Sequence, residues 1–235
     1  MSMGDFVISG GRGHAKVLRD LLELLGSRVA AVIDNDLSLQ SPFSDVNIYY
    51  GKVGLREFLR SAYQHKEQEV SAVVAIGGSN CRDRTSCYEL MMEMGLQSKI
   101  LVHPSAVIAN SAVLGSGTQI LGGAFVGSAS KLGDFCILNS GSIVDHDCVL
   151  GRGVHIAPGA VLTGEIEVGD FSFIGANSTI LPGRKIGANV IVGAGSVVTR
   201  DIPSGVTIVG SCKYNTRVTR STGKKLTCIN ILLIL

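Results

Sequence analysis

LGDFCILNSGSIVDHDCVLGRGVHI, residues 132–156, is the stretch that decides the fold of this chain. Val, Ile or Leu stands at every sixth position within it, and the same step runs from Ile108 to Val198 over sixteen positions. A period of six fits neither an amphipathic helix nor a simple alternating strand. It predicts a prism of three short strands per turn, in which one aliphatic side chain of each strand points inward. Three hexapeptides make one coil of eighteen residues, so the repeat predicts about five stacked coils.

The corners of this prism are predicted from the small residues between the aliphatic positions. Two positions before most of the inward residues stands a small side chain, such as Ala124, Ser130 or Cys136. Glycine often follows the inward residue directly, and we expect these glycines to supply the special backbone angles of the corners. They are Gly115, Gly127, Gly133, Gly151, Gly169, Gly175, Gly187 and Gly193.

The composition agrees with a narrow aliphatic interior. The 235 residues are 46% hydrophobic with 30 glycines, yet only 5% are aromatic and none is Trp. The net charge of +2 gives no basic field for nucleic acid, and we expect no nucleic-acid partner. The mean hydropathy is positive, but no apolar run approaches the roughly 18 residues of a spanning helix, so no membrane partner is expected.

The cellular location is predicted from two weaker signals. Met1–Ser9 lacks the basic flank and apolar core of a signal peptide. The six cysteines show no C-x-x-C pair and no disulfide-scaffold density, and we interpret them as reduced thiols. A cytoplasmic protein is therefore expected.

The first hundred residues follow a different pattern, in which short apolar strands alternate with helices. This alternation predicts a small parallel α/β sheet. The expected strands are Asp5–Ser9, Val29–Ile33, Val70–Ile76 and Lys99–Val102, and the expected helices carry the apolar face Val17, Leu18, Leu21, Leu22 and Leu25 and cover Val53–Tyr63 and Arg82–Met94. We place the domain limits at residues 1–102, 103–210 and 211–235, the last being a tail whose composition does not fit the coils before it.

A glycine loop, residues 10–14, separates the first strand from the first helix. Free backbone N–H groups in such a loop suit an anionic ligand. The dinucleotide fingerprint is incomplete, because Lys16 stands where its third glycine should be, so NAD is disfavoured. Asp34, at the end of the second strand, fits a hydrogen bond to a ribose or base. The alternative is that the glycines serve turn geometry only.

GGRGHAKV at residues 10–17, joined to a hexapeptide prism that contains ILNSGSIVDHD at 137–147 and GVHIAPGA at 153–160, resembles the sialic acid O-acetyltransferase family of sugar acyltransferases. That family includes N-acetyltransferases of nucleotide-linked 4-amino sugars in bacillosamine, perosamine and viosamine pathways. The resemblance implies an N-terminal half-Rossmann unit, a left-handed parallel β-helix and acetyl-CoA as co-substrate. It also implies a homotrimer with active sites between neighbouring subunits. We expect no metal.

The resemblance implies catalytic roles for three residues and a co-substrate contact for a fourth. His146 matches the catalytic base, Asp147 the acid that raises its basicity, and His155 a contact to acetyl-CoA. Gly164, eighteen residues after His146, matches the backbone N–H donor to the oxyanion. The chemistry agrees, because a neutral imidazole removes a proton from an attacking amine well near pH 7. Asp145 remains the alternative orienting acid, since adjacent strand residues usually point opposite ways.

Two further groups complete the candidate site. Asn139, His155, Gly164, Ala176 and Ala194 are expected to bind acetyl-CoA, with Asn139 equally able to form an internal ladder. The nucleotide sugar is expected at Arg12, Gly13, His14, Asp34, Asn35 and Gly77. Arg12 is unusual at its position, and it would contact a pyrophosphate or block the expected pose.

The predicted function is acetyl-CoA-dependent N-acetylation of a nucleotide-linked 4-amino-4,6-dideoxy sugar, for surface polysaccharide or glycoprotein glycan synthesis. O-acetylation of sialic acid or a related sugar is the alternative, and a non-catalytic sugar-nucleotide sensor or scaffold is a third reading. A zinc lyase of the β-helix carbonic anhydrase type is disfavoured, because His103, His146 and His155 are 43 and 9 residues apart. The family's closing V-x-G-x-P-A-K turn is replaced here by Val209-Gly210-Ser211-Cys212-Lys213.

Overall fold

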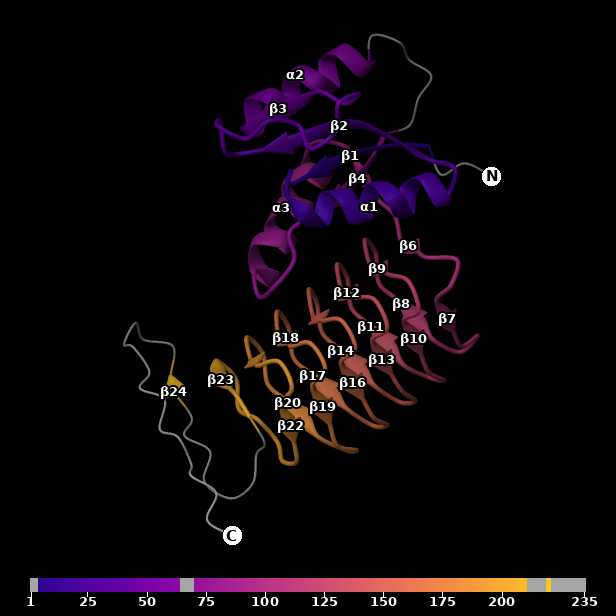
Figure 1. The fold of residues 1–235 in the computed structure, drawn as a ribbon, viewed down its shortest axis with the longest axis vertical. Coiled ribbons are helices and arrows are strands. Elements are labelled where there is room, and N and C mark those ends of the chain that lie inside the picture. The colour runs from indigo at the N-terminus through magenta and orange to yellow at the C-terminus, as the bar shows by residue number, and fades with distance from the viewer. Residues whose placement is uncertain (1–3, 64–69, 211–218, 221–235) are drawn as a thin grey trace.

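An α/β unit and a β-helix follow each other along the chain in the computed structural model, which describes residues 4–63, 70–210 and 219–220 (Figure 1). The elements of the first unit are β1 (Asp5–Ser9), α1 (Gly13–Leu24), β2 (Arg28–Asp34), β3 (Ile48–Tyr50), α2 (Gly51–Tyr63), β4 (Val70–Val74), α3 (Cys81–Glu93) and β5 (Gln97–Ser98).

The sheet of the α/β unit is parallel, with strand order β3-β2-β1-β4-β5. Its apolar side chains form two cores, one under α1 and one under α2 and α3. The expected apolar face of α1 is wrong at Val17, which is 42% exposed, while Ala15 is buried instead. The edge strand β3 was not predicted, because its three residues are too few to show a period.

The strand expected over Lys99–Val102 is formed only at Leu101–Val102, and Gln97–Ser98 forms a separate strand before it. β5 pairs with β4 and ends the sheet of the α/β unit, whereas β6 (Leu101–Val102) pairs with β9 (Gln119–Ile120) of the β-helix. The chain therefore passes from one sheet to the other between Ser98 and Leu101.

The β-helix is a left-handed prism with three parallel faces. Neighbouring strands within each face are eighteen residues apart from β6 to β22, as in Phe125↔Ile143 and Ile143↔Val161, which confirms the predicted coil length. The step shortens only at the end of the β-helix, where Ile191 pairs with Thr207. The eight-stranded sheet contains β6, β9, β12 (Ile137–Leu138), β15 (His155–Ile156), β18 (Phe173–Ile174), β21 (Ile191–Val192), β23 (Val206–Ile208) and β24 (Thr219–Arg220). The six-stranded sheet contains β7 (Val107–Ile108), β10 (Phe125–Val126), β13 (Ile143–Val144), β16 (Val161–Leu162), β19 (Thr179–Ile180) and β22 (Val197–Val198). The third face, called here the five-stranded β-helix sheet, contains β8 (Val113–Leu114), β11 (Lys131–Leu132), β14 (Val149–Leu150), β17 (Glu167–Val168) and β20 (Lys185–Ile186).

The interior of the prism is the aliphatic ladder that the repeat predicts. From Ile120 to Val198 the sixth-position residues are buried, and Ile108 and Leu114 pack partly buried at the open end. Since burial of aliphatic side chains is the main favourable term in folding, the repeat supplies most of the stability of this unit.

The role expected for the glycines after the inward residues is wrong. The left-handed backbone angles occur two positions later, as at Phe135 and Gly153, where φ is +59° and +65°. The glycines are needed for close approach of successive coils instead. A Cβ on Gly133 would lie 2.8 Å from the carbonyl carbon of Gly151, and one on Gly127 would lie 2.6 Å from that of Asp145.

The predicted tail, residues 211–235, lies outside the described residues except for β24. The backbone of β24 pairs antiparallel with β23, Val206 opposite Arg220, at the far end of the β-helix.

The α/β unit lies against the side of the β-helix, with α1 and α3 nearest to the coils (Figure 1). The Nε of Arg82 in α3 donates to Oδ1 of Asn189 at 2.7 Å, and its guanidinium lies over the ring of Phe171. The rings of Tyr88 and Phe135 stack with their centroids 4.5 Å apart. Helix α3 therefore spans several coils and sets how the two units meet.

Candidate active site

His146 and Asp147 form a hydrogen-bonded pair at the corner between β13 and β14. The imidazole Nδ1 lies 2.8 Å from Asp147 Oδ2 and donates to the carboxylate. Asp147 has a φ of +56°, and this left-handed conformation turns its side chain back towards the preceding residue. Asp145, the alternative acid, accepts a bond from the main-chain N–H of His146 at 2.7 Å instead.

The charge around His146 favours its protonated form. The hydrogen bond to Asp147 raises the pKa of His146 above its usual value, and the nearby charges of Asp145 and Glu165 act in the same direction. The side chain is 51% exposed, so a reactant can reach the ring. In the neutral ring Nδ1–H faces Asp147, which leaves the lone pair on Nε2 as a proton acceptor.

Gly164 lies directly against this imidazole, one coil further along the same corner. A Cβ added at Gly164 would overlap Cε1 and Nε2 of His146. Within the part of the chain that the structure describes, the Gly164 N–H donates to no backbone carbonyl. The corner therefore brings a proton acceptor and a backbone donor side by side.

His155 lies on β15 of the eight-stranded sheet and belongs to a different cluster from His146. Its Nδ1 donates to the carbonyl of Gly78 at 3.0 Å, its Nε2 lies 3.4 Å from Asn139 Nδ2, and its ring meets Phe173 edge-on. Burial lowers the pKa of His155 to about 3, so the ring is neutral near pH 7. Oδ1 of Asn139 accepts from Ser140 N–H at 2.8 Å, which orients the amide towards His155.

Ala176 and Ala194 lie one above the other at the corner between the eight-stranded and six-stranded sheets. Asn139 lies at the same edge, two coils before Ala176. The carbonyl of Ala176 accepts a bond from Gly195 N–H at 2.8 Å. Ala176 is half-buried and Ala194 is exposed, and both leave the outer surface of this edge without a long side chain.

A cavity of about 440 Å³ opens at the carboxyl ends of β1, β2 and β4 in the α/β unit. This place is the switch point of a parallel sheet, where ligands commonly bind. Five of the six predicted substrate residues line the cavity: Arg12, His14, Asp34, Asn35 and Gly77. Gly13, the sixth, begins α1 beside the cavity.

The polar groups of the cavity are held by short-range bonds. Asp34 accepts from the N–H of Gly11 at 2.8 Å and from that of Asp36 at 2.9 Å, which fixes its carboxylate. Arg12 is exposed and pairs with Asp36 at 2.9 Å, so in this structure its guanidinium is turned to the rim. His14 Nε2 lies 2.9 Å from Gln119 Oε1 on β9, and burial lowers the pKa of His14.

Eight lining residues of the cavity were not predicted, and three of them come from helix α3 or the loop before it. Asn80 precedes α3, Asp83 lies in its first turn and Cys87 lies in its middle. Their position in the chain could have predicted them, because the loop after the third parallel strand opens at the same edge of the sheet as the glycine loop.

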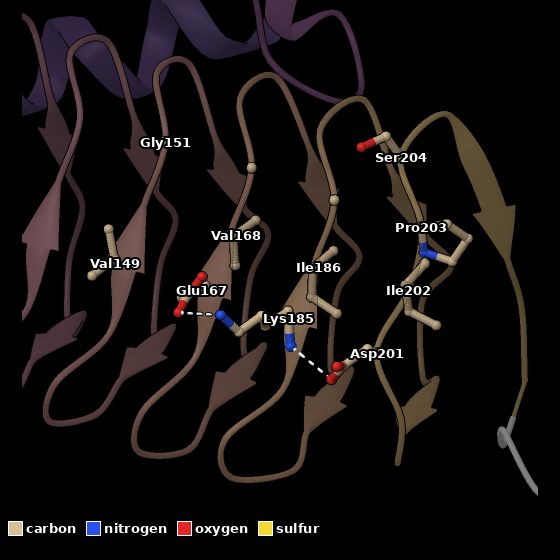
Figure 2. Close-up of a pocket in the computed structure, with 12 residues that line it drawn as sticks. Val149, Gly151, Glu167, Val168, Lys185, Ile186, Asp201, Ile202, Pro203 and Ser204 are labelled. Carbon is tan, nitrogen blue, oxygen red and sulfur yellow. Dashed lines mark hydrogen bonds and ion pairs between the residues drawn. The ribbon is translucent and has the colours of Figure 1, made fainter.

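A second, shallower groove of about 670 Å³ runs along the five-stranded β-helix sheet (Figure 2). Figure 2 shows Glu167 and Lys185 facing each other across neighbouring strands, where they form an ion pair of 2.9 Å. Asp201 accepts from the backbone N–H of Lys185 at 3.0 Å. The predicted site residues line the other cavity and the two corners instead, so the larger groove is not the candidate site.

The described residues show neither a metal-binding cluster nor a membrane-spanning helix. Over residues 4–63, 70–210 and 219–220, no group of three or more His, Cys, Asp and Glu side chains is arranged to hold a metal ion. In the same residues, no helix has the length and apolar character to cross a membrane.

Comparison with known proteins agrees with this architecture. Residues 5–89 match the PglD N-terminal domain, and residues 129–164 and 165–200 match the bacterial transferase hexapeptide (six repeats). PerB from Caulobacter crescentus, solved with CoA and GDP-perosamine, is 35% identical with a TM-score of 0.77, covering 88% of this chain and 95% of its own. The acetyltransferase domain of PglB from Neisseria gonorrhoeae, solved with acetyl coenzyme A, is 30% identical with a TM-score of 0.75, covering 88% and 96%.

A curated relative gives a shorter match. UDP-N-acetylbacillosamine N-acetyltransferase of Bacillus subtilis is 33% identical over 123 residues, so the match spans about half of each protein, 51% of this chain and 52% of the relative. The two structures cover the α/β unit and the β-helix together. The chain belongs to the sialic acid O-acetyltransferase family of hexapeptide-repeat sugar acyltransferases, in its nucleotide-amino-sugar N-acetyltransferase branch.

Proposed function

We propose that this protein transfers the acetyl group of acetyl-CoA to the amino group of a nucleotide-linked 4-amino-4,6-dideoxy sugar. The observation that carries the proposal is the His146–Asp147 pair against Gly164, in a chain whose α/β unit holds a 440 Å³ cavity at its switch point. Two of the named relatives, the Bacillus subtilis N-acetyltransferase and PerB, act on or are bound to a nucleotide amino sugar, which supports the same substrate class here.

The chemistry assigns one step to each corner residue. The sugar nitrogen attacks the thioester carbonyl carbon while Nε2 of His146 takes one N–H proton. Asp147 offsets the charge of the resulting imidazolium, and the Gly164 N–H donates to the oxyanion. The C–S bond then breaks, and the CoA sulfur leaves with the proton from His146. The products are the N-acetyl sugar and free CoA.

Acetyl-CoA fits the edge that carries Asn139, Ala176 and Ala194. The two alanines leave room for a pantetheine chain against the wall of the coils. His155 and Asn139 lie at the head of this edge, beside the α/β unit. The neutral His155 ring suits a contact with the uncharged acetyl-bearing end of the co-substrate.

The nucleotide part of the substrate fits the cavity of the α/β unit. Backbone N–H groups at the start of α1 suit the pyrophosphate, and the fixed carboxylate of Asp34 has lone pairs left for a ribose or base donor. Arg12 is long enough to exchange its partner Asp36 for a phosphate oxygen.

A homotrimer belongs to the proposal, because the two parts of the site lie on opposite edges of the six-stranded sheet. His146 lies at one edge and Asn139 at the other. Five of the six outward residues of this sheet are apolar and form a ladder that only Thr179 interrupts, with Val107 58%, Ile143 38% and Val197 36% exposed. Packing this sheet against a second copy would bring His146 of one subunit to the acetyl-CoA edge of the next, which single-chain spacing cannot do.

Two broader assignments also remain proposals. We place the activity in the cytoplasm, where cysteines stay reduced, and the four cysteines of the described residues are free thiols. The product would serve surface polysaccharide or glycoprotein glycan synthesis.

The test is turnover with UDP-, dTDP- and GDP-linked 4-amino-4,6-dideoxy sugars beside free sialic acids, followed by thiol release from acetyl-CoA. We expect release with at least one nucleotide amino sugar and a product that resists alkaline hydroxylamine, because an amide survives it and an ester does not. Turnover of sialic acid alone, giving a hydroxylamine-labile ester, would establish the O-acetyltransferase instead. Nucleotide binding without thiol release would indicate a sensor.

A further inference from the structure

Arg84 is the largest fully buried side chain of the described residues, and none of the roles above uses it. It lies in α3, where it donates through three nitrogens to three main-chain carbonyls. Nε lies 3.1 Å from the carbonyl of Phe135, Nη1 lies 3.1 Å from that of Ile76, and Nη2 lies 2.6 Å from that of Gly153. A guanidinium is suited to this task because its donors diverge from one rigid plane.

The three carbonyls belong to both units of the protein. Phe135 and Gly153 occupy equivalent corners of two successive β-helix coils, eighteen residues apart. Ile76 follows β4 and lines the nucleotide cavity. One side chain therefore joins the loop under the cavity to two coils of the β-helix.

The same loop is held a second time, two residues further on. Gly78 accepts the Nδ1–H of His155 at 3.0 Å. Gly77 lies between the two held carbonyls, and a Cβ there would lie 3.9 Å from His155 Cε1 and 4.0 Å from His14 Cγ. The loop that forms the floor of the cavity thus has its position set by the β-helix rather than by the α/β unit alone.

The close packing of α3 at this junction leaves little freedom to adjust. Gly153 has a φ of +65°, and a Cβ there would come within 2.6 Å of Thr85 Oγ1. Loss of the Arg84 bonds would therefore leave the carbonyl of Ile76 without this donor and remove its tie to the two coils.

We propose that Arg84 is a positioning residue, which sets the nucleotide-sugar cavity in register with the acetyl-CoA edge of the β-helix. The inference rests on the proposed function, because it assumes that the cavity holds the nucleotide part of the acceptor. Arg84 touches neither reactant. It acts through Ile76 and the loop that Ile76 begins.

The test compares Arg84→Lys with Arg82→Lys, a matched control on the same helix. Arg82 also joins α3 to the β-helix, through Asn189 and Phe171, but it does not touch the cavity loop. Lysine keeps the charge at position 84 and can reach one carbonyl in place of three. We expect kcat/KM for the nucleotide amino sugar to fall about tenfold or more in Arg84→Lys, with the KM for acetyl-CoA within about twofold of wild type. Arg82→Lys should leave both values within about twofold.

Thermal unfolding of the same variants separates positioning from simple support. If both variants lose similar stability and only Arg84→Lys loses kcat/KM for the sugar, the proposal holds. Equal kinetic effects of the two variants, or an equal rise in KM for both reactants, would overturn it. Arg84→Gln serves as a second variant, and failure of both Arg84 variants to fold while Arg82→Lys folds would make Arg84 a folding residue. Wild-type turnover in the same assay is the separate check of the proposed function.

Discussion

His146 and Asp147 are adjacent in the chain, and their side chains nevertheless meet at 2.8 Å because Asp147 adopts a left-handed backbone conformation with φ of +56°. An extended strand would point them to opposite sides. The corner thus converts two neighbours into a base and its partner. Substitutions at this corner distinguish the roles of its residues, because each one is expected to change the rate of acetyl transfer in a different way.

Asp147→Asn is expected to move the acidic limb of the pH–rate profile to lower pH. The base must be neutral, so activity falls as pH drops through the pKa of His146. The hydrogen bond to Asp147 raises that pKa, and its loss lowers it, which shifts the limb down. The plateau should fall by about tenfold or more, because the ring loses its orienting acceptor. The profile of kcat/KM between pH 5 and 9 measures both, and an unmoved limb with an unchanged plateau would assign the role to another acid.

Asp145→Asn is the matched control for that profile. Asp145 bonds the main-chain N–H of His146 and not its ring. Its charge still raises the pKa of His146 slightly, so a smaller downward shift is expected and the plateau should stay near wild type.

His146→Ala should remove about 10²- to 10⁴-fold of turnover, the usual contribution of a positioned general base. The side chain is half exposed and its loss creates no buried cavity, so the assembly should remain intact. Thiol-release kinetics measure the loss of turnover, and light scattering on the same sample measures whether the assembly is intact. Full activity of this variant would mean that an unrecognised base does the work.

Gly164→Ala is expected to damage the site through His146. Its Cβ would overlap the imidazole, whereas its φ lies outside the left-handed region and tolerates alanine. The ring would have to leave the corner, and turnover should fall by about tenfold or more. In a His146→Ala background the overlap is gone, so the second substitution should cost little further stability or activity. Additive losses in the double variant would show that Gly164 acts independently of the imidazole.

The sequence predicted the β-helix well because one chemical requirement repeats at a fixed spacing. The aliphatic residues at every sixth position, such as Leu132, Leu138 and Val144, are themselves the residues that fill the interior. The role of the glycines that follow the inward residues was predicted wrongly, because their role depends on a contact between two coils. Gly133 faces the backbone of the next coil, and a contact between residues eighteen positions apart leaves no distinctive local signal.

The candidate site was predicted in part. His146, Asp147 and Gly164 share one corner, so a motif and a coil length were enough to bring them together. The position of His155 against Gly78 depends on how α3 packs on the coils, over a separation of 77 residues. Arg84 was missed for the same reason, since its three acceptors are backbone carbonyls, which any residue type presents.

Ile143→Glu should break the proposed trimer. Ile143 lies in the middle of the apolar ladder on the six-stranded sheet and is 38% exposed in the single chain. A carboxylate buried between copies would cost several kcal/mol, so the protein should become monomeric and lose turnover. Light scattering and thiol release measure the two effects. Val113→Glu, on the five-stranded β-helix sheet and 56% exposed, is the control and should change neither. An intact trimer with Ile143→Glu would place the interface elsewhere.

The stability of the domain junction should fall as pH drops from about 6.5 to 5, the upper limit being the usual histidine value. Burial lowers the pKa of His155 to about 3 and also lowers that of His14. The folded state therefore binds fewer protons than the unfolded state below pH 6.5, and each such histidine costs up to about 1.4 kcal/mol per pH unit. The carboxylates with lowered pKa values, Asp36 and Asp45, act below this window. Denaturant unfolding at several pH values measures the slope. In His155→Gln the slope of the free energy of unfolding against pH should decrease by the equivalent of about one proton. In His146→Gln, which removes a group of raised pKa, the slope should increase slightly. An unchanged slope in His155→Gln would show that His155 is not held neutral at the junction.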